Sequence, residues 1–111
     1  MLRLDNDFDE NLYIDTPCNG LDVVTYFIRQ EGTPFLKIGK TNNIFFRFSA
    51  LQTGNPYQLE VLYVVYADIE RELHKAFESM KIRGEWFFIP DKHIQYVFGA
   101  VNKMGHEMIT F

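Results

Sequence analysis

The sequence of 111 residues is poor in three features that would assign it to particular protein classes. Its only cysteine is Cys18, which excludes a disulfide within the chain and argues against a disulfide-stabilised secreted domain. No apolar run approaches the ~18 residues that a transmembrane helix needs. The first residues also lack the apolar stretch of a signal peptide. We therefore expect a cytoplasmic protein with no membrane partner.

Basic residues are outnumbered by acidic ones, 11 against 15, so the formal net charge is -4. The deficit lies in residues 1–22, which contain six acidic residues and one basic residue and therefore carry -5. Residues 23–111 contain ten basic and nine acidic residues and carry +1. The net charge thus does not exclude a nucleic-acid partner for the body of the chain, although +1 is less basic than is usual for a tight, non-specific DNA binder.

Apolar and aromatic residues are abundant, with a hydrophobic fraction of 47%, eleven Phe and six Tyr. This content excludes a disordered chain and is sufficient for one core. A turn-forming segment at residues 16–20 precedes the first predicted strand. We expect residues 1–21 to be a loosely structured acidic leader and residues 22–111 to be a single domain. The leader could be a solvated tail, a segment that opposes DNA binding, or a DNA mimic that binds a protein.

The order of apolar segments predicts a small α+β fold. Residues 22–29, 35–39 and 58–66 are rich in β-branched and aromatic residues, as is typical of strands, and the first two are expected to form a hairpin. Three helices are expected, ending near Gln52, Met80 and Gly105, with Thr41 or Asn42, Asp68 and Asp91 as their caps. Residues 85–89 are a short extended piece, and residues 108–111 could add a short strand. The prediction is a small three-stranded antiparallel sheet flanked by about three helices, in the order β-β-α-β-α-(β)-α.

The hairpin geometry pairs two polar side chains. A two-residue turn at Glu31 and Gly32 would place Tyr26 opposite Lys37, with about 5 Å between the Cβ atoms. Such a pair is either an ordinary contact on a half-exposed sheet or part of a functional site. A turn of another length would change the pairing.

Two short patterns carry weaker information. Gly39-Lys40-Thr41 is similar to the end of a P-loop, but Pro34 stands where that pattern requires an earlier glycine, so a nucleotide triphosphatase is not expected. The amides that open the following helix remain a candidate phosphate site. Glu70 and His74 are four residues apart on one helix face and could ligate a metal, or they could be a solvated acid and a half-buried histidine.

Several segments taken together resemble one nuclease superfamily. Tyr26-Phe27-Ile28, followed about ten residues later by Lys37-Ile38-Gly39, resembles the two sequence marks of the GIY-YIG nucleases. Lys37 stands where the second mark usually has tyrosine, a departure that some members share. Further segments match the branch named for a phage T5 open reading frame and labelled a DNA-binding domain: Arg47, Leu51-Gln-Thr-Gly-Asn-Pro56, Glu70-x-x-Leu73-His74-x-x-Phe77 and Gly84-Glu85-Trp86-Phe87. The resemblance covers about residues 24–89.

The resemblance implies a phage or bacterial endonuclease that hydrolyses DNA phosphodiester bonds with one Mg²⁺ or Mn²⁺ ion. The matching positions give the catalytic candidates Tyr26, Lys37, Arg47, Glu70 and His74, with Glu70 as the metal ligand and Glu85 in a supporting role. Arg47 would hold the phosphate through paired hydrogen bonds. Tyr26 would position or deprotonate the attacking water, and Lys37 beside it would lower its pKa or bind phosphate itself.

The expected partner is DNA. Lys40, Thr41 and Asn42 at the helix start are candidate DNA contacts, and Trp86 is either a core residue or a platform for an unpaired base. Two other functions remain open: a catalytically weak or inactive DNA-binding module of the same fold, and a protein-interaction or inhibitor role that uses the acidic leader. The sequence does not set the oligomeric state, although a homodimer would allow both DNA strands to be cut.

Overall fold

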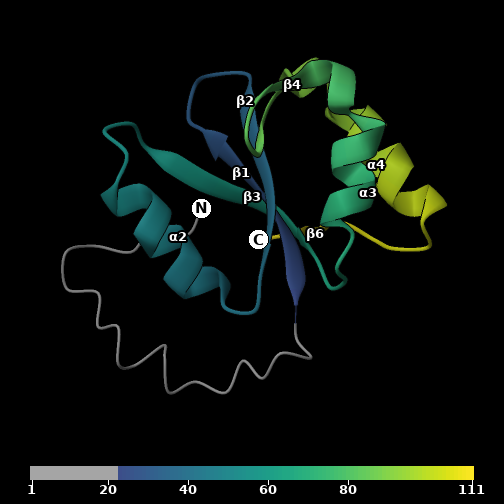
Figure 1. The fold of residues 1–111 in the computed structure, drawn as a ribbon, viewed down its shortest axis with the longest axis horizontal. Coiled ribbons are helices and arrows are strands. Elements are labelled where there is room, and N and C mark those ends of the chain that lie inside the picture. The colour runs from purple at the N-terminus through teal and green to yellow at the C-terminus, as the bar shows by residue number, and fades with distance from the viewer. Residues whose placement is uncertain (1–22) are drawn as a thin grey trace.

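The computed structural model describes residues 23–111, so the predicted acidic leader and Cys18 lie outside the described residues. A six-stranded antiparallel sheet with helices on both faces forms this part of the chain (Figure 1). The strand order is β4-β5-β2-β1-β3-β6. The strands are β1 Val24–Gln30, β2 Phe35–Thr41, β3 Leu59–Val65, β4 Lys81–Arg83, β5 Trp86–Phe88 and β6 Ile109–Thr110.

The α+β class and the three long strands confirm the prediction, but its sheet was too small. The predicted extended piece at residues 85–89 is β5, which pairs with β2, and the predicted C-terminal strand is β6, which pairs with β3. Strand β4 was missed because all three of its residues are exposed and produce no apolar alternation. The observed order is therefore β-β-α-β-α-β-β-α-β.

Three α-helices flank the sheet: α2 Ile44–Thr53, α3 Glu70–Ala76 and α4 Ile94–Lys103. Their predicted caps were wrong. The Asn43 side chain caps α2 by accepting from the Phe46 amide. Asp68 and Asp91 cap no helix, because the N-cap positions of α3 and α4 are Ile69 and His93, and each aspartate instead forms an ion pair with a basic side chain. Helix α3 also ends earlier than predicted, and a 3₁₀ turn at Glu78–Met80 follows it. None of the helices in residues 23–111 is long and apolar enough to span a membrane.

The sheet separates two apolar layers (Figure 1). Helix α2 covers one face, where the buried residues are Tyr26, Ile28, Phe48, Leu59, Val61 and Val64. Helices α3 and α4 cover the other face over a larger layer that includes Phe27, Leu36, Ile38, Leu73, Phe87, Val97 and Val101. Successive side chains of β1 enter different layers, with Tyr26 and Ile28 on the α2 face and Phe27 on the other.

The β1–β2 hairpin has a longer turn than predicted. Strands β1 and β2 are joined by the four residues 31–34, and Tyr26 pairs with Gly39 while Lys37 pairs with Ile28. The predicted Tyr26–Lys37 pair was therefore wrong by two residues. A shift of two keeps every side chain on its predicted face, because the side-chain period of a strand is two.

Candidate active site

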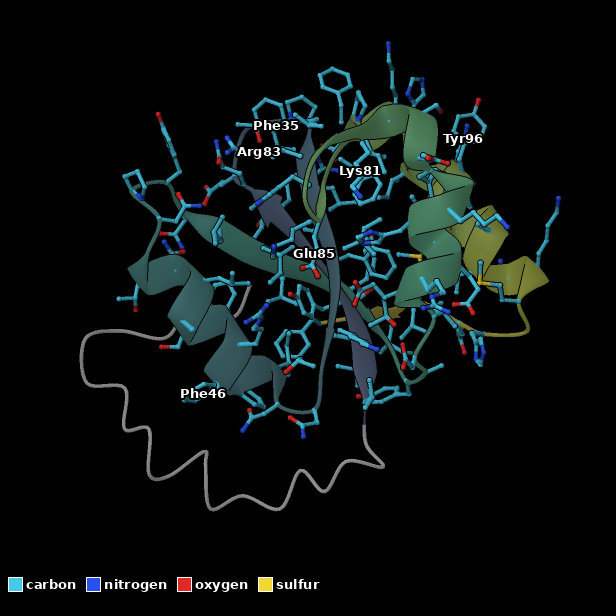
Figure 2. The ribbon with its side chains drawn as sticks, in the orientation of Figure 1. Phe35, Phe46, Lys81, Arg83, Glu85 and Tyr96 are labelled. Carbon is cyan, nitrogen blue, oxygen red and sulfur yellow. The ribbon has the colours of Figure 1, made fainter. Side chains whose placement is uncertain are left out.

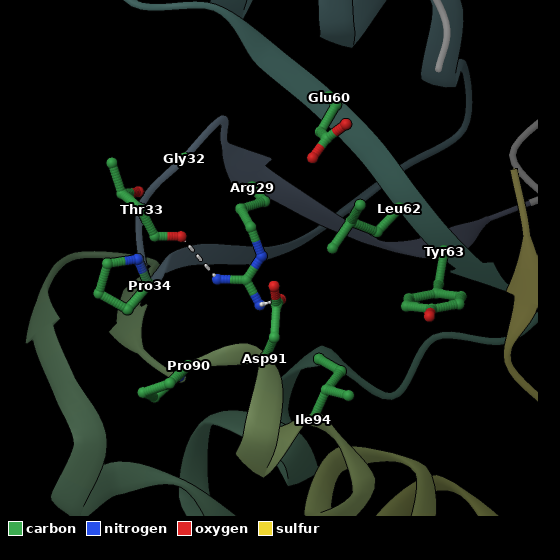
Figure 3. A pocket seen from close by; sticks show the side chains of 10 residues that line it. All are labelled: Arg29, Gly32, Thr33, Pro34, Glu60, Leu62, Tyr63, Pro90, Asp91 and Ile94. Atoms are coloured by element: carbon green, nitrogen blue, oxygen red, sulfur yellow. Dashed lines mark hydrogen bonds and ion pairs between the residues drawn. The ribbon is translucent and has the colours of Figure 1, made fainter.

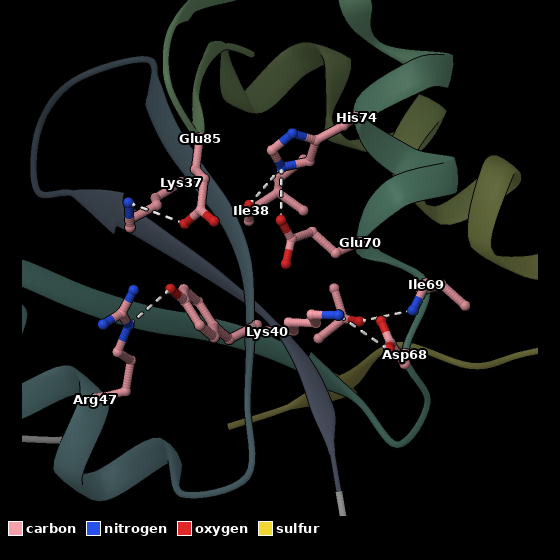
Figure 4. A network of polar contacts seen from close by, with 11 residues as sticks. Lys37, Ile38, Lys40, Arg47, Asp68, Ile69, Glu70, His74 and Glu85 are labelled. Atoms are coloured by element: carbon pink, nitrogen blue, oxygen red, sulfur yellow. Dashed lines mark hydrogen bonds and ion pairs between the residues drawn. The ribbon is translucent and has the colours of Figure 1, made fainter.

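The candidate residues meet at the edge of β2, where β5 stops covering it. Strand β5 pairs with β2 only as far as Lys37, and the Glu85 carbonyl then accepts a hydrogen bond from the Ile38 amide (N···O 3.0 Å). The Ile38 carbonyl accepts from His74 Nε2 at 2.7 Å. Figure 4 shows Lys37, Arg47, Glu70, His74 and Glu85 around this stretch of β2.

Tyr26 and Arg47 approach this edge from the α2 face. Tyr26 lies in the core of the sheet, and its side chain is fully buried. Its hydroxyl oxygen accepts a hydrogen bond from Arg47 Nε at 3.4 Å. Burial raises the pKa of the Tyr26 phenol, and the hydrogen bond from Arg47 opposes that rise only in part. The phenol is thus neutral at physiological pH.

Arg47 keeps most of its hydrogen-bonding capacity. It lies on the exposed side of α2, and the hydrogen bond with Tyr26 raises its pKa further. Its two terminal guanidinium nitrogens make no hydrogen bond or ion pair within residues 23–111. These nitrogens form the planar fork that suits a phosphate group.

Lys37 pairs with Glu85 rather than with Tyr26. Lys37 Nζ lies 3.1 Å from Glu85 Oε1 and 5.5 Å from the centre of the Trp86 ring. The expectation that Lys37 lowers the pKa of Tyr26 was therefore wrong: the pKa is raised, and the neighbouring cation is Arg47. The carboxylate that Lys37 contacts comes from the turn before β5, whose position could not be known from the hairpin alone.

Glu70 and His74 approach from α3, on the other face of the sheet. Glu70 Oε1 lies 3.8 Å from His74 Nε2, and both side chains are largely buried. Burial raises the pKa of Glu70, and the negative charge of the nearby Glu85 raises it further. The proximity of two carboxyl groups from separate elements is a feature that a cation would stabilise.

The carboxylates also define what kind of metal site these residues could form. Within residues 23–111, no group of three or more His, Cys, Asp or Glu side chains is arranged to hold a metal ion. Mg²⁺ needs only one or two protein carboxylates, because it retains several waters. Glu85 Oε1 already lies 3.1 Å from Lys37 Nζ, whereas Glu70 forms an ion pair only with His74 among the described residues, so Glu70 has the greater capacity for a cation. Glu70, with Glu85 nearby, therefore fits a divalent ion held by few protein ligands.

Gly39 is a site residue whose role the sequence reasoning missed. A Cβ atom at this position would lie 2.5 Å from Tyr26 Cζ and 2.8 Å from Glu85 Oε1. The phenol and the carboxylate thus meet over the bare backbone of Gly39. A glycine inside a predicted strand can mark such a close approach and was the available sequence indication.

The predicted DNA contacts lie in two places. Lys40 is exposed and pairs with Asp68 (Nζ···Oδ2 3.2 Å), a partner that the sequence analysis had assigned to a helix cap. Asn42 is exposed, whereas the Thr41 hydroxyl accepts from the Asn43 amide at 3.0 Å and organises the start of α2. Trp86 is half-buried and packs beside the α2-face layer.

A cavity elsewhere in the molecule contains none of these candidates. It has a volume of about 640 Å³ and lies where β1 ends, beside the 31–34 turn and the segment that leads into α4 (Figure 3). Arg29 reaches into it from β1, donating to the carbonyls of Thr33 and Ile89 at 3.0 Å each and pairing with Asp91 at 3.1 Å. These contacts join three segments, so Arg29 has a structural role.

Comparison with known proteins supports the resemblance on which the site was predicted. Searches of the curated proteins and of the solved structures found no match. A family model described as "T5orf172 domain" matches residues 23–102. This range contains every candidate site residue named above and most of the chain. The chain therefore belongs to the T5orf172 domain family, which is related to the GIY-YIG nucleases.

Proposed function

We propose that this protein is a metal-dependent endonuclease that hydrolyses phosphodiester bonds of DNA at the β2 edge. The observation that carries the proposal is the meeting of an arginine with unused hydrogen-bond donors and two close carboxyl groups around Gly39. Phosphodiester hydrolysis needs charge neutralisation on the phosphate, an activated water and stabilisation of the leaving oxygen. The family relationship independently favours nuclease chemistry.

Arg47 is the proposed phosphate ligand. Its Nε is held by the Tyr26 hydroxyl, so the side chain is oriented before substrate arrives. The terminal nitrogens can then donate two parallel hydrogen bonds to a phosphate. In this scheme Tyr26 positions Arg47 and does not act as a base, since its buried phenol has a raised pKa.

Glu70 is the proposed ligand of Mg²⁺ or Mn²⁺, with Glu85 as its neighbour in a supporting role. A divalent ion here would supply positive charge that lowers the pKa of the attacking water and stabilises the leaving oxygen. His74 donates its Nε2 proton to the Ile38 carbonyl and so stands at a fixed place beside Glu70. Lys37 holds Glu85 in place and contributes to the positive potential around the phosphate.

A DNA-binding module without strong catalysis is the second candidate. The observation that favours it is the complete burial of Tyr26, which leaves this family tyrosine neutral and without solvent contact. In that case Arg47 and the exposed Lys40 would still bind phosphates, and affinity would fall steeply with salt.

Cleavage of supercoiled plasmid DNA, with and without Mg²⁺ or Mn²⁺, tests the proposal. We expect nicking by the wild type with metal and background rates for Glu70→Gln. Arg47→Ala should slow cleavage by about 10²–10³-fold, the usual loss for one charge-stabilising donor. The matched controls Glu72→Gln and Arg71→Ala alter exposed residues of α3 and should cut as the wild type does.

Thermal unfolding separates a lost site from a lost fold. Mn²⁺ should raise the Tm of the wild type and of Glu72→Gln but not that of Glu70→Gln, because a ligand stabilises only the folded state that binds it. Without metal, Glu70→Gln should unfold no lower than the wild type, because a raised carboxyl pKa means that the charge at position 70 opposes folding. If the wild type does not nick DNA but binds it, and Arg47→Ala weakens that binding, the nuclease proposal is rejected in favour of the DNA-binding module.

A further inference from the structure

Part of the α2 face of the sheet carries exposed aromatic side chains. Phe35 pairs with Phe88 and Lys37 pairs with Trp86, so the three aromatic residues share one face of β2 and β5. Phe35 is 36% exposed and Phe88 is 50% exposed, and their rings meet edge to face with centroids 6.3 Å apart. Burial of these rings in the domain core therefore does not explain their presence.

A small hollow lies beside these aromatic residues. It has a volume of about 290 Å³ and is lined by Gln30, Phe35, Asn55, Ile82, Arg83 and Trp86, which we call the aromatic pocket. Figure 2 shows Phe35 and Arg83 on the same side of the molecule, above Glu85. Its walls are mostly apolar, and the amide side chains of Gln30 and Asn55 supply hydrogen-bonding groups at its rim.

A cation lines the aromatic pocket. Arg83 is exposed on the edge strand β4, pairs across the strands with Trp86 and forms no ion pair within residues 23–111. Lys37 lies over Trp86 on the side of the candidate active site. Aromatic faces beside an uncompensated cation suit a ligand that has flat rings and negative charge.

We propose that the aromatic pocket binds an unpaired nucleobase of the DNA strand whose phosphate lies at the β2 edge. Phe35, Lys37 and Gly39 follow one another on the same face of β2, with about 7 Å between successive positions. The aromatic pocket thus begins two residues from Lys37, next to the place assigned to the phosphate. Trp86 and Phe35 stack on the base, Arg83 binds the adjoining backbone, and the substrate is DNA that is single-stranded or has an unpaired nucleotide.

This inference rests on the proposed function for the position of the phosphate, but not for the chemistry of the aromatic pocket. A base within a continuous duplex would first have to leave the stack, which costs free energy that an already unpaired base does not require. A protein partner of the same surface would need a carboxylate against Arg83, whereas a nucleic-acid strand carries its negative charge in every nucleotide.

Trp86 is the only tryptophan of the chain, so its fluorescence reports directly on the aromatic pocket. The experiment titrates full-length Glu70→Gln, in EDTA, with a mixed-sequence 12-nucleotide single strand and with the corresponding blunt duplex. We expect the single strand to quench Trp86 and to bind at least about 10-fold more tightly than the duplex. Phe35→Ala should weaken single-strand binding by about 5- to 150-fold, the range that corresponds to the loss of one stacked base.

Three further variants make the test specific. Arg83→Ala changes an exposed side chain of an edge strand, so it should fold normally, and it should also weaken single-strand binding. Tyr96→Ala removes an exposed aromatic ring of α4 (Figure 2), and Lys103→Ala removes an exposed cation of the same helix. Both should bind as the parent does, because they lie on the opposite face of the sheet.

The inference is overturned if Trp86 is not quenched, if the duplex binds as tightly as the single strand, or if Phe35→Ala and Arg83→Ala bind normally. A dimer in sedimentation that Phe35→Ala dissociates would identify a second copy of the chain as the occupant and would also overturn it. If the wild type cleaves plasmid DNA but the pocket variants bind single strands normally, the proposed nuclease function stands and the base-binding role of the aromatic pocket is rejected. If Trp86 quenching depends on the pocket residues but the wild type cleaves no DNA, base binding stands and the nuclease function is rejected.

Discussion

At the scale of single residues, Gly39 determines whether the candidate site can form. Any side chain at position 39 would occupy the space in which the Tyr26 phenol and the Glu85 carboxylate meet. The obstacle includes a ring that is itself packed in the core, so it has little room to move. A displaced Tyr26 ring would also move the hydroxyl that accepts from Arg47 Nε at 3.4 Å.

Gly39→Ala should therefore destabilise the domain by about 1–3 kcal/mol, the usual cost of forcing an extra methyl group into a packed region. Gly99→Ala is the matched control, because Gly99 lies within α4 and no atom would meet its Cβ within 4 Å. That change should stabilise the domain by about 0.5–1 kcal/mol through a higher helix propensity. Urea unfolding of both variants measures the difference, and equal midpoints would contradict the packing argument.

The ionisation of the site residues could not be predicted from the sequence for a physical reason. A Tyr–Lys pair across a hairpin predicts a lowered phenol pKa, but the pKa depends on total burial and on every neighbouring charge. Tyr26 is enclosed by α2, and its cation is Arg47, twenty-one residues away in sequence. The resemblance identified the residues that meet, whereas only the three-dimensional packing gives their partners.

At the scale of elements, the long strands were predictable and the short ones were not. Strands β1, β2 and β3 bury most of their residues and therefore show dense β-branched and aromatic segments. Strand β4 has three exposed residues and exists because it pairs with β5. Hairpin parity was also predictable, since the observed register differs by two residues and preserves each face.

The acidic caps failed because neither aspartate occupies an N-cap position: the N-cap of α3 is Ile69, and a 3₁₀ turn at Asp91–His93 precedes α4. Asp68 and Asp91 precede helical segments and match the sequence preference for an N-cap. Each instead pairs with a basic side chain from the sheet, Lys40 and Arg29 respectively. The Arg29 contacts join β1 to the 31–34 turn and to the segment before α4, which makes them an element-scale clamp.

Arg29→Met should destabilise the domain by about 2–4 kcal/mol, because two carbonyl oxygens lose their donors while the apolar stem is retained. Asp91→Asn should cost less than about 1 kcal/mol, since Asp91 is 88% exposed and solvent screens its charge. Arg29 is only 4% exposed, so the two members of one ion pair differ strongly in importance. Chemical denaturation of both variants tests this asymmetry, and comparable losses would refute the clamp.

At the scale of the whole molecule, the two parts of the chain carry net charges of opposite sign. Residues 23–111 carry +1 and residues 1–22 carry -5, so the basic groups near the site compete with acidic groups on the same chain. Electrostatic attraction to DNA acts over about a Debye length, roughly 10 Å at 0.1 M salt. We propose that the acidic leader lowers the affinity of the domain for DNA through this long-range repulsion.

Replacing the six acidic residues of residues 1–22 by their amides in the full-length chain should strengthen DNA binding. The gain should be about 3- to 10-fold at 50 mM salt and should largely vanish at 300 mM, because salt screens charges that are not in contact. Fluorescence anisotropy with a single-stranded oligonucleotide measures both values. A chain in which the order of residues 1–22 is scrambled keeps the charge and should bind as the wild type does. If the neutralised chain binds with the same affinity as the wild type at each salt concentration, the leader is passive. If the neutralised chain binds more weakly than the wild type, the carboxylates of the leader assist binding.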